Sequence, residues 1–255
     1  MLYLGIDGGG SKTTFLLEDD AGRTLAHFQT GPSNLFSVGE IRARQSIIEG
    51  ITKLPVRPDA ACAGFAGAGR PDGLRFYREC LESVLPNVKI LVETDAFVGY
   101  MGAIGTEPGV LLIAGTGSIA IGRRTDGVMI RVGGWGPYFG DEGGGHWIGR
   151  EAVRAALHAT DAHEFPEFIS AIRLALRLES MEQVVTAWNS GKLDVSTIAS
   201  LAPIVFQQHP SEPSNRILHE AAAHLRTILR TAVAQVGTSY RLAIAGSIFR
   251  QREFR

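Results

Sequence analysis

One pattern occurs twice in this sequence and constrains its fold more than any other feature: a short apolar run, a glycine-rich turn and a second apolar run. The first copy has its turn at residues 7–13, after the run 3–6, and the second has its turn at residues 115–118, after the run 110–114. Two short strands joined by a tight turn form a hairpin. The repeat therefore predicts two similar halves, 1–107 and 108–255, and a cleft between such halves is a common ligand site.

The remaining segments alternate between strand and helix patterns. Apolar runs at 14–18 and 24–28 extend the first hairpin to a three-stranded meander, and strands are predicted at 60–66, 89–92, 119–122 and 241–245. Helical spacing of apolar residues predicts helices at 41–53, 72–84 and 147–159, and a mostly helical region from 165 to 236 with breaks near 191 and 209–210. Strands that alternate with helices after a meander predict an α/β fold with mixed sheets.

Composition and charge narrow the class of ligand. Of the 255 residues, 45% are hydrophobic, and the formal charge is -1 with acidic and basic residues interleaved. We therefore expect a small-molecule ligand, no nucleic acid partner and no membrane partner. The two cysteines, Cys62 and Cys80, suit a reducing compartment with buried thiols. No apolar run approaches the ~20 residues that span a bilayer, and no signal sequence precedes the first strand, so we expect a cytoplasmic protein.

The first glycine-rich turn has the composition of a phosphate-binding loop. Glycines let backbone N–H groups approach an anion, a carboxylate can hold the hydration shell of Mg²⁺, and a lysine can neutralise phosphate charge. The turn offers these groups in the order Asp7, Gly8, Gly9, Gly10, Ser11, Lys12 and Thr13. Because a strand and not a helix is expected next, it differs from the Gly-x-x-x-x-Gly-Lys-Ser/Thr loop. Taken alone, an ordinary glycine-rich hairpin is the alternative.

Two later turns repeat this chemistry more weakly. Each follows an apolar run and contains small residues that would let a nucleotide come close. They comprise Gly115, Thr116, Gly117 and Ser118 in the middle of the chain, and Gly246 and Ser247 near its end. The order of the three turns, each after a strand, is more specific than any one of them.

In this order the sequence resembles the BadF/BadG/BcrA/BcrD ATPase family. That family groups N-acetylglucosamine kinases, glucosamine kinases and the ATPase activators of benzoyl-CoA reductase, inside the actin, hexokinase and heat-shock ATPase superfamily. The three turns match the family's two phosphate motifs and its adenosine motif, and residues 94–96 resemble the stretch that carries its catalytic aspartate. The match covers essentially the whole chain. It implies two ribonuclease H-like (actin-like ATPase) domains, each with a mixed sheet flanked by helices.

The resemblance also implies roles for individual residues. ATP would bind at the three turns, Asp7 would hold Mg²⁺ through water, and Asp95 would be the catalytic base. The sugar would be bound by Ser33, Asn34, Asp95, Gly134, Trp135, Asp141, Glu142 and Gly145. An asparagine amide can both donate to and accept from a sugar hydroxyl. From the residues alone, Asp95 could instead be a helix N-cap, and Asp141 or Glu142 could favour the start of the helix near 147.

These roles imply an enzyme that transfers the γ-phosphoryl group of ATP to the 6-hydroxyl of an amino sugar, with N-acetylglucosamine as the first choice, and we expect a homodimer. The alternatives are a glucosamine kinase, an ATPase activator of the benzoyl-CoA reductase or 2-hydroxyacyl-CoA dehydratase type, and a sugar sensor without catalysis. An activator needs thiolates for a shared iron–sulfur cluster, whereas Cys62 and Cys80 fall in a predicted buried strand and a predicted helix. Because the family continues beyond its adenosine motif, the second domain is expected to be truncated at its C-terminal end.

Overall fold

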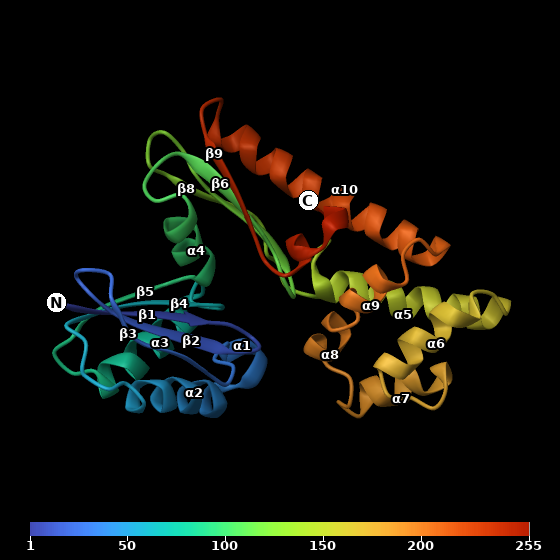
Figure 1. The fold of residues 1–255 in the computed structure, drawn as a ribbon, viewed down its shortest axis with the longest axis horizontal. Helices are drawn as coiled ribbons and strands as arrows, with labels where there is room; N and C mark the ends of the chain where they lie inside the picture. Colours follow the sequence, from blue (N-terminus) through green and yellow to red (C-terminus); the bar gives the residue numbers. More distant parts are fainter. Residues whose placement is uncertain (255) are drawn as a thin grey trace. The chain divides into compact units, whose positions relative to one another are not determined.

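A computed structural model describes residues 1–254 and divides the chain into two compact units, Met1–Gly102 and Ala103–Arg255. Each unit contains one mixed sheet with helices packed on it, so the predicted α/β class is confirmed (Figure 1). Within the described residues, no helix is both long and apolar enough to cross a lipid bilayer.

The first unit has a five-stranded sheet in the order β3-β2-β1-β4-β5. The first three strands form the predicted antiparallel meander, and the other two run parallel to β1. The strands are β1 (Leu2–Gly8), β2 (Thr13–Asp19), β3 (Thr24–Thr30), β4 (Ala60–Phe65) and β5 (Lys89–Glu93). The helices are α1 (Leu35–Val38), α2 (Glu40–Thr52), α3 (Pro71–Val84) and α4 (Asp95–Ala103).

The pleat of β1 decides which of its residues can reach a ligand. Leu4, Ile6 and Gly8 are buried, whereas Gly5 and Asp7 between them are exposed. Successive side chains of a strand point to opposite faces, so the apolar residues enter the core while Asp7 stays accessible near the end of the strand.

The second unit has a four-stranded sheet in the order β8-β7-β6-β9, with an antiparallel meander and one parallel strand next to β6. This repeats the order and directions of β3-β2-β1-β4. The predicted likeness of the two halves is thus present in their strand connections. The strands are β6 (Gly109–Ala114), β7 (Ser118–Arg123), β8 (Met129–Gly133) and β9 (Arg241–Ala245).

Helices follow one another between β8 and β9 of the second unit. They are α5 (Gly145–Ala162), α6 (Pro166–Ala175), α7 (Val184–Asn189), α8 (Val195–Ala199), α9 (Ala202–Gln207) and α10 (Glu212–Val236). Three 3₁₀ turns are η1 (Met181–Gln183), η2 (Ile248–Arg250) and η3 (Arg252–Phe254). The predicted helical region and its two breaks are therefore confirmed.

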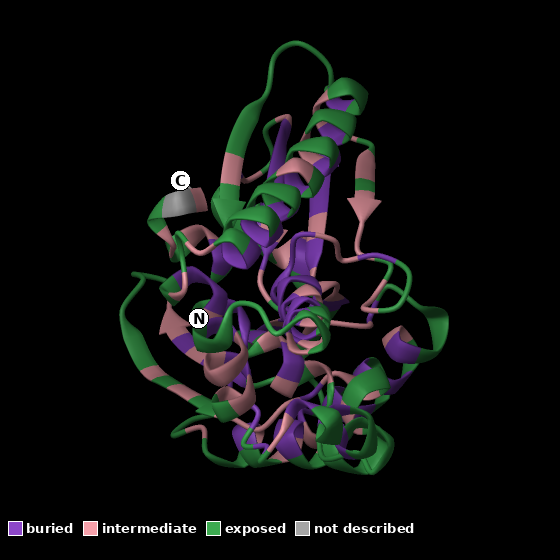
Figure 2. Cartoon of the chain, turned by 90° about the vertical axis from the view of Figure 1, so that its right-hand side faces the viewer, coloured by how far each residue is buried: buried purple, intermediate pink, exposed green. Residues whose placement is uncertain are grey.

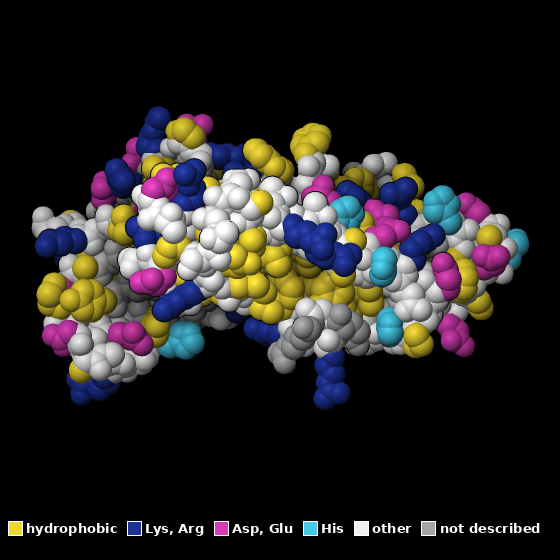
Figure 3. All heavy atoms as spheres, turned by 90° about the horizontal axis from the view of Figure 1, so that it is seen from above, with side chains coloured by type: hydrophobic (Ala, Val, Ile, Leu, Met, Phe, Trp, Pro, Cys, Tyr) yellow, Lys and Arg dark blue, Asp and Glu magenta, His cyan; other side chains and the backbone are white. Residues whose placement is uncertain are grey.

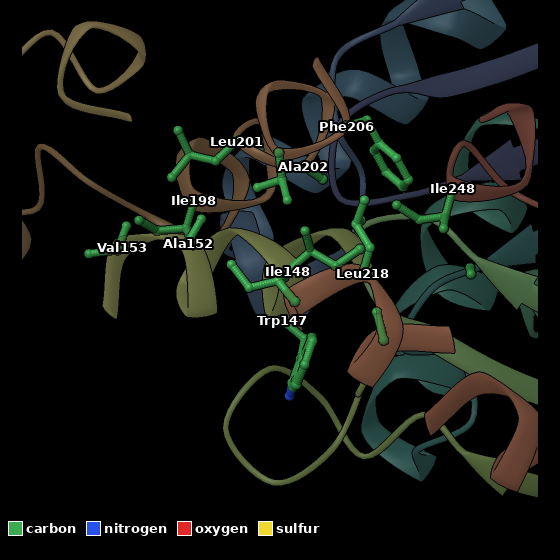
Figure 4. Packing of buried hydrophobic residues seen from close by; sticks show 14 of the residues in the cluster. Trp147, Ile148, Ala152, Val153, Ile198, Leu201, Ala202, Phe206, Leu218 and Ile248 are labelled. Atoms are coloured by element: carbon green, nitrogen blue, oxygen red, sulfur yellow. The ribbon is translucent and has the colours of Figure 1, made fainter. Parts of the chain in front are cut away.

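The core of the second unit lies where α5 and α10 pack on the sheet and on the shorter helices. Ile148 of α5 faces Leu218 of α10, and Phe206 of α9 adds an aromatic ring beside them (Figure 4). One side of α10 is a buried stripe and the opposite side is exposed (Figure 2). The apolar residues recur at the helical period, as expected of an amphipathic helix that covers a core.

Strand β9 forms an edge of the second sheet within the described residues. Two of its apolar side chains, Leu242 and Ile244, are 52% and 50% exposed. Hydrophobic side chains also form a visible band on the face shown in Figure 3. An edge strand with exposed apolar residues offers unpaired backbone groups to another strand.

Candidate active site

The first glycine turn joins β1 to β2 and is closed by a hydrogen bond from the Gly9 N–H to the Lys12 carbonyl at 2.9 Å. A strand follows it, as predicted. A Cβ added to Gly8 would lie 2.2 Å from the Phe65 ring, so packing requires glycine there. Gly9 and Gly10 have ordinary space for a Cβ, so packing does not require glycine at these two positions.

Two hydroxyls predicted to meet ligands are instead buried under the turn. The Thr13 hydroxyl lies 2.7 Å from the Ser33 hydroxyl and 2.8 Å from the Gly31 carbonyl oxygen, and both side chains have no exposed surface. Ser11 and Lys12 at the tip are exposed. The hydroxyls of Thr13 and Ser33 therefore hold the turn together, and the groups free to contact an anion are those at the tip.

The two aspartates of the first unit come together through Gly64. Gly64 pairs with Asp7 across the β1–β4 ladder, and a Cβ added to it would lie 3.2 Å from the Cα of Asp95. Glycine at 64 thus lets the first residue of α4 approach the sheet beside Asp7. Burial raises the pKa of both carboxyls, the charge of Lys12 lowers that of Asp7, and the charge of Asp7 further raises that of Asp95.

Asp95 is not the N-cap of α4, so that alternative interpretation is wrong. The Thr94 hydroxyl accepts from the Phe97 N–H at 3.1 Å, and Asp95 is itself the first helical residue. The Asp95 carboxylate accepts from the neighbouring Ala96 N–H, at 2.9 Å through Oδ1, and the residue keeps solvent exposure at the start of α4.

Asn34 lies at the start of the short helix α1. Its Oδ1 accepts from the Phe36 N–H at 3.0 Å, which makes it the N-cap of α1. A Cβ added to Gly67 would lie 3.3 Å from the same oxygen, so Asn34 sits against the end of β4. The cap occupies Oδ1 and leaves the two N–H groups of the amide as donors.

The equivalent hairpin of the second unit carries the turn Gly115–Ser118. The Gly115 and Thr116 carbonyls accept from the Gly145 and His146 N–H groups at 2.7 and 2.8 Å, so the start of α5 is bonded to the turn. The Thr116 side chain is exposed at the tip. The Ser118 side chain is buried, and its hydroxyl donates to the Glu142 carbonyl at 2.7 Å.

Asp141 lies directly against this turn. A Cβ on Gly117 would be 2.3 Å from its Oδ2, and its Oδ1 accepts from the Gly136 N–H at 3.2 Å. Gly144 is the N-cap of α5 and no side chain bonds there, so Asp141 does not cap the helix by a hydrogen bond; a favourable effect of its charge on the start of α5 stays an alternative. Burial raises the pKa of Asp141, the Gly136 N–H lowers it and the charge of Glu142 raises it.

Trp135 presents an exposed aromatic face in the same loop. Its side chain is 69% exposed, and the Arg131 guanidinium lies 4.6 Å from the ring centroid. Arg131 also donates to the carbonyls of Gly133 and Gly134, at 3.0 and 2.5 Å. Gly134 has φ +69 and lies tight against Ile119, so glycine is required where the chain turns into the loop.

The third turn follows β9. Gly246 has φ +108, and a Cβ there would lie 2.1 Å from the Ala114 carbonyl oxygen, at the end of β6. No other residue fits this position. The exposed residues Gly246 and Ser247 therefore lie beside the end of the central strand of their sheet, as Ala66 and Gly67 do after β4.

Several residues that shape these groups escaped the sequence analysis. Gly64 and Thr94 set the approach of Asp95, and Arg131 orders the Trp135 loop. Thr94 carries a local signal, since a threonine before an apolar helical run is a common N-cap. The other two act on residues distant in sequence or on a ring face, for which no local pattern exists.

Comparison with known proteins decides the family. A model of the BadF/BadG/BcrA/BcrD ATPase family matches residues 4–255. The chain belongs to this ATPase family. The matched range includes all three glycine turns and runs from the first strand of the first unit to the end of the second.

Named relatives of this family member span most of its length. An N-acetylmuramic acid/N-acetylglucosamine kinase of Clostridium acetobutylicum is 34% identical over 240 residues, covering 90% of this chain and 78% of that protein. An N-acetyl-D-glucosamine kinase of Dictyostelium discoideum is 31% identical over 256 residues, covering 92% and 80%. The crystal structure of a candidate N-acetylglucosamine kinase from Chromobacterium violaceum superposes with a TM-score of 0.81 at 27% identity, covering 98% of this chain and 88% of that one.

Proposed function

We propose that this member of the ATPase family is an ATP-dependent kinase that phosphorylates the 6-hydroxyl of an amino sugar, with N-acetylglucosamine as the acceptor. Kinases of N-acetylated amino sugars are its relatives at 31% and 34% identity over about nine-tenths of the chain. The observation that carries the proposal is Asp95, a solvent-exposed carboxylate with a raised pKa that lies next to Gly64, the residue paired with Asp7 at the end of β1.

Asp95 is the proposed general base. A raised pKa makes a carboxylate a better proton acceptor near the operating pH, as long as it remains ionised there. The proton of the sugar 6-hydroxyl passes to Asp95 as the oxygen bonds to the γ-phosphorus of ATP. The bond between that phosphorus and the β–γ bridging oxygen breaks, and ADP leaves with the bridging oxygen.

The glycine turns are the proposed contacts for the phosphates of ATP. The N–H group of Gly10, the exposed Lys12 and the exposed Thr116 have the charge and polarity for this role, with Gly9 holding the shape of the turn through its bond to Lys12. Gly246 and Ser247 are proposed to lie against the adenosine, where a side chain on 246 would already collide with β6.

Asp7 is the proposed anchor for Mg²⁺. Its carboxylate is exposed at the end of β1, and among the described residues no hydrogen bond occupies it. One carboxylate with waters and phosphates is the usual protein contribution to a Mg²⁺ site, so the residues fit the ion. When bound, Mg²⁺ neutralises the charge that develops on the phosphate oxygens.

The sugar contacts are proposed for both units. Asn34 can donate its amide N–H groups to a sugar hydroxyl, and Asp141 can accept from one. Trp135 offers a flat apolar face to a pyranose ring, Glu142 belongs to the same loop, and Gly145 begins α5 directly after it. A homodimer and a cytoplasmic location are further parts of this proposal.

The ATPase activator is the second candidate and is less well supported. Its shared cluster would need accessible thiolates. Cys80 has no exposed surface and Cys62 is half-buried, and burial raises the pKa of both thiols. Neither thiol has the environment that favours a thiolate.

A coupled ADP-release assay tests the function. The chain is incubated with Mg·ATP and a panel that includes N-acetylglucosamine, N-acetylmuramic acid, glucosamine and glucose. We expect release of ADP that depends on the sugar and is fastest with N-acetylglucosamine. Release that is independent of sugar would support the activator, and sugar binding by calorimetry without release would support a sensor.

A further inference from the structure

We propose that the phenolic hydroxyl of Tyr77 is a positioning group, which fixes the turn Ser33–Asn34 to the end of β4 and so sets the place of the sugar-binding amide. The inference rests on the proposed function, because Asn34 is assigned there to the sugar. It adds a residue that touches neither substrate.

The contacts of the hydroxyl define this role. It accepts from the Leu35 N–H at 2.8 Å, and it lies 2.9 Å from the Ser33 carbonyl oxygen and 3.0 Å from that of Ala66. Its single proton can serve either carbonyl while its lone pair accepts the amide. One side chain on α3 therefore joins both flanks of Asn34 to the residue that follows β4.

The ring of Tyr77 is held independently of its hydroxyl. It has no exposed surface and stacks on Phe65 at 4.1 Å between centroids, with 7° between the planes. Burial raises the pKa of Tyr77 to about 12, the Leu35 N–H lowers it and the charge of Asp95 raises it, so the group stays protonated at neutral pH. Phenylalanine would keep the ring contacts and remove only the hydroxyl.

The opposite side of the same turn is bonded to the phosphate-type hairpin. The Ser33 and Asn34 N–H groups both donate to the Gly9 carbonyl, at 3.0 and 3.1 Å, and the Ala66 N–H donates to the Gly8 carbonyl at 2.8 Å. Loss of the Tyr77 hydroxyl would leave these bonds in place. A shift of Asn34 that follows loss of the hydroxyl should therefore weaken sugar binding more than ATP binding.

Tyr77→Phe is the variant that tests the proposal. The Leu35 N–H and the carbonyls of Ser33 and Ala66 lose their shared partner, so the turn that carries Asn34 is held less firmly. The KM for the sugar should rise by about tenfold with kcat nearly unchanged. The KM for Mg·ATP should change by less than about twofold, since the turn 8–13 keeps its bonds. Tyr3→Phe is the matched control, because Tyr3 is exposed on β1. An unchanged sugar KM in a folded Tyr77→Phe variant would overturn the proposal.

Leu35→Pro provides a second, independent variant. Leu35 is the first residue of α1, where proline is tolerated, and Asn34 before it has φ -70 and ψ 105, which proline allows. The change removes the N–H that donates to Tyr77 and leaves the tyrosine in place. We expect a similar rise in the sugar KM and a double variant no worse than the more affected single one; full additivity would contradict a shared interaction.

Failure of the function and failure of this inference give different results. A wild-type protein without sugar-dependent ADP release contradicts the proposed function. Amide hydrogen exchange of residues 33–35 then still decides the role of Tyr77, without any substrate. Faster exchange in Tyr77→Phe is expected, and unchanged exchange would count against positioning.

Discussion

Single residues decide the protonation chemistry of this protein. Asp7, Asp95 and Asp141 all have carboxyl pKa values raised mainly by burial, and each lies against a glycine turn or its neighbour. Groups with pKa values shifted by burial and by a nearby like charge cluster at functional sites, although structural networks also produce them. For Asp95, the nearby like charge is that of Asp7, which pairs with Gly64 on the neighbouring strand.

Asp95→Asn should lower turnover by orders of magnitude, because asparagine cannot take the proton. The Ala96 N–H keeps its acceptor, so sugar binding should persist. In the wild type, kcat/KM should rise with pH as Asp95 ionises, with an inflection above the ordinary value of about 3.9. Glu82→Gln, an exposed change on α3, is the control for steady-state kinetics. A near-normal rate in Asp95→Asn would refute the assignment of the base.

Asp95→Asn should lower turnover but raise the free energy of unfolding at neutral pH. A carboxyl whose folded pKa is raised binds protons more tightly when folded, so its contribution is full below the unfolded pKa and is lost as pH rises through the folded one. At neutral pH the ionised Asp95 carboxylate destabilises the folded state, and asparagine removes this charge. The variant should therefore resist urea better than the wild type at neutral pH, and the difference should vanish in acid.

At the scale of elements, helix ends show where side chains control backbone structure. Asp194 precedes the five-residue helix α8, and its Oδ1 lies 2.7 Å from both the N–H and the hydroxyl of Thr197. These bonds hold the pKa of Asp194 below its ordinary value. A helix this short depends on its cap and on packing.

Asp194→Ala should reduce the free energy of unfolding by about 1 kcal/mol at neutral pH through loss of the cap. For a lowered pKa, the stabilisation is present above the unfolded value and is lost as pH falls through the folded one. Urea titrations at neutral and acid pH should therefore show a difference that shrinks in acid. Asp161→Ala, exposed on α5, is the control; equal midpoints at neutral pH would contradict the cap.

Local patterns predicted most elements, because strand and helix periods are visible within a few residues. The strand 241–245 and the helix 72–84 agree with β9 and α3 almost to the residue. The region 165–236 was predicted only as mostly helical, since packing and not periodicity divides it into short helices. In the site, the Ser33 hydroxyl is buried against Thr13, 20 residues away, and Tyr77 bonds to Ser33 and Leu35 over 44 and 42 residues, so no local pattern carries that information.

At the scale of the whole molecule, the chain has two separate apolar cores. One is built around Phe15 and Leu17 in the first unit, and the other around Ile148 and Phe168 in the second. All three tryptophans, at positions 135, 147 and 188, belong to the second unit. Tryptophan fluorescence therefore reports on one core, whereas circular dichroism reports on both.

Phe15→Ala should destabilise the first unit selectively. Phe15 has no exposed surface and stacks on Phe28 at 5.4 Å, so truncation should cost about 3–5 kcal/mol. In a denaturant titration, the circular dichroism should fall earlier while the tryptophan fluorescence transition stays in place. Phe168→Ala should instead move the fluorescence transition. Coincident shifts of both probes in Phe15→Ala would mean that the two units unfold together.

The open edge at β9 makes protein concentration an experimental variable. In the part of the chain that the structure describes, β9 has no strand on its outer side, and half-exposed Leu242 and Ile244 on it favour contact between copies as the solution becomes more concentrated. A specific activity measured at one dilution therefore need not describe another. Light scattering recorded on the same samples as the kinetics would separate the rate of a single chain from that of its associated forms.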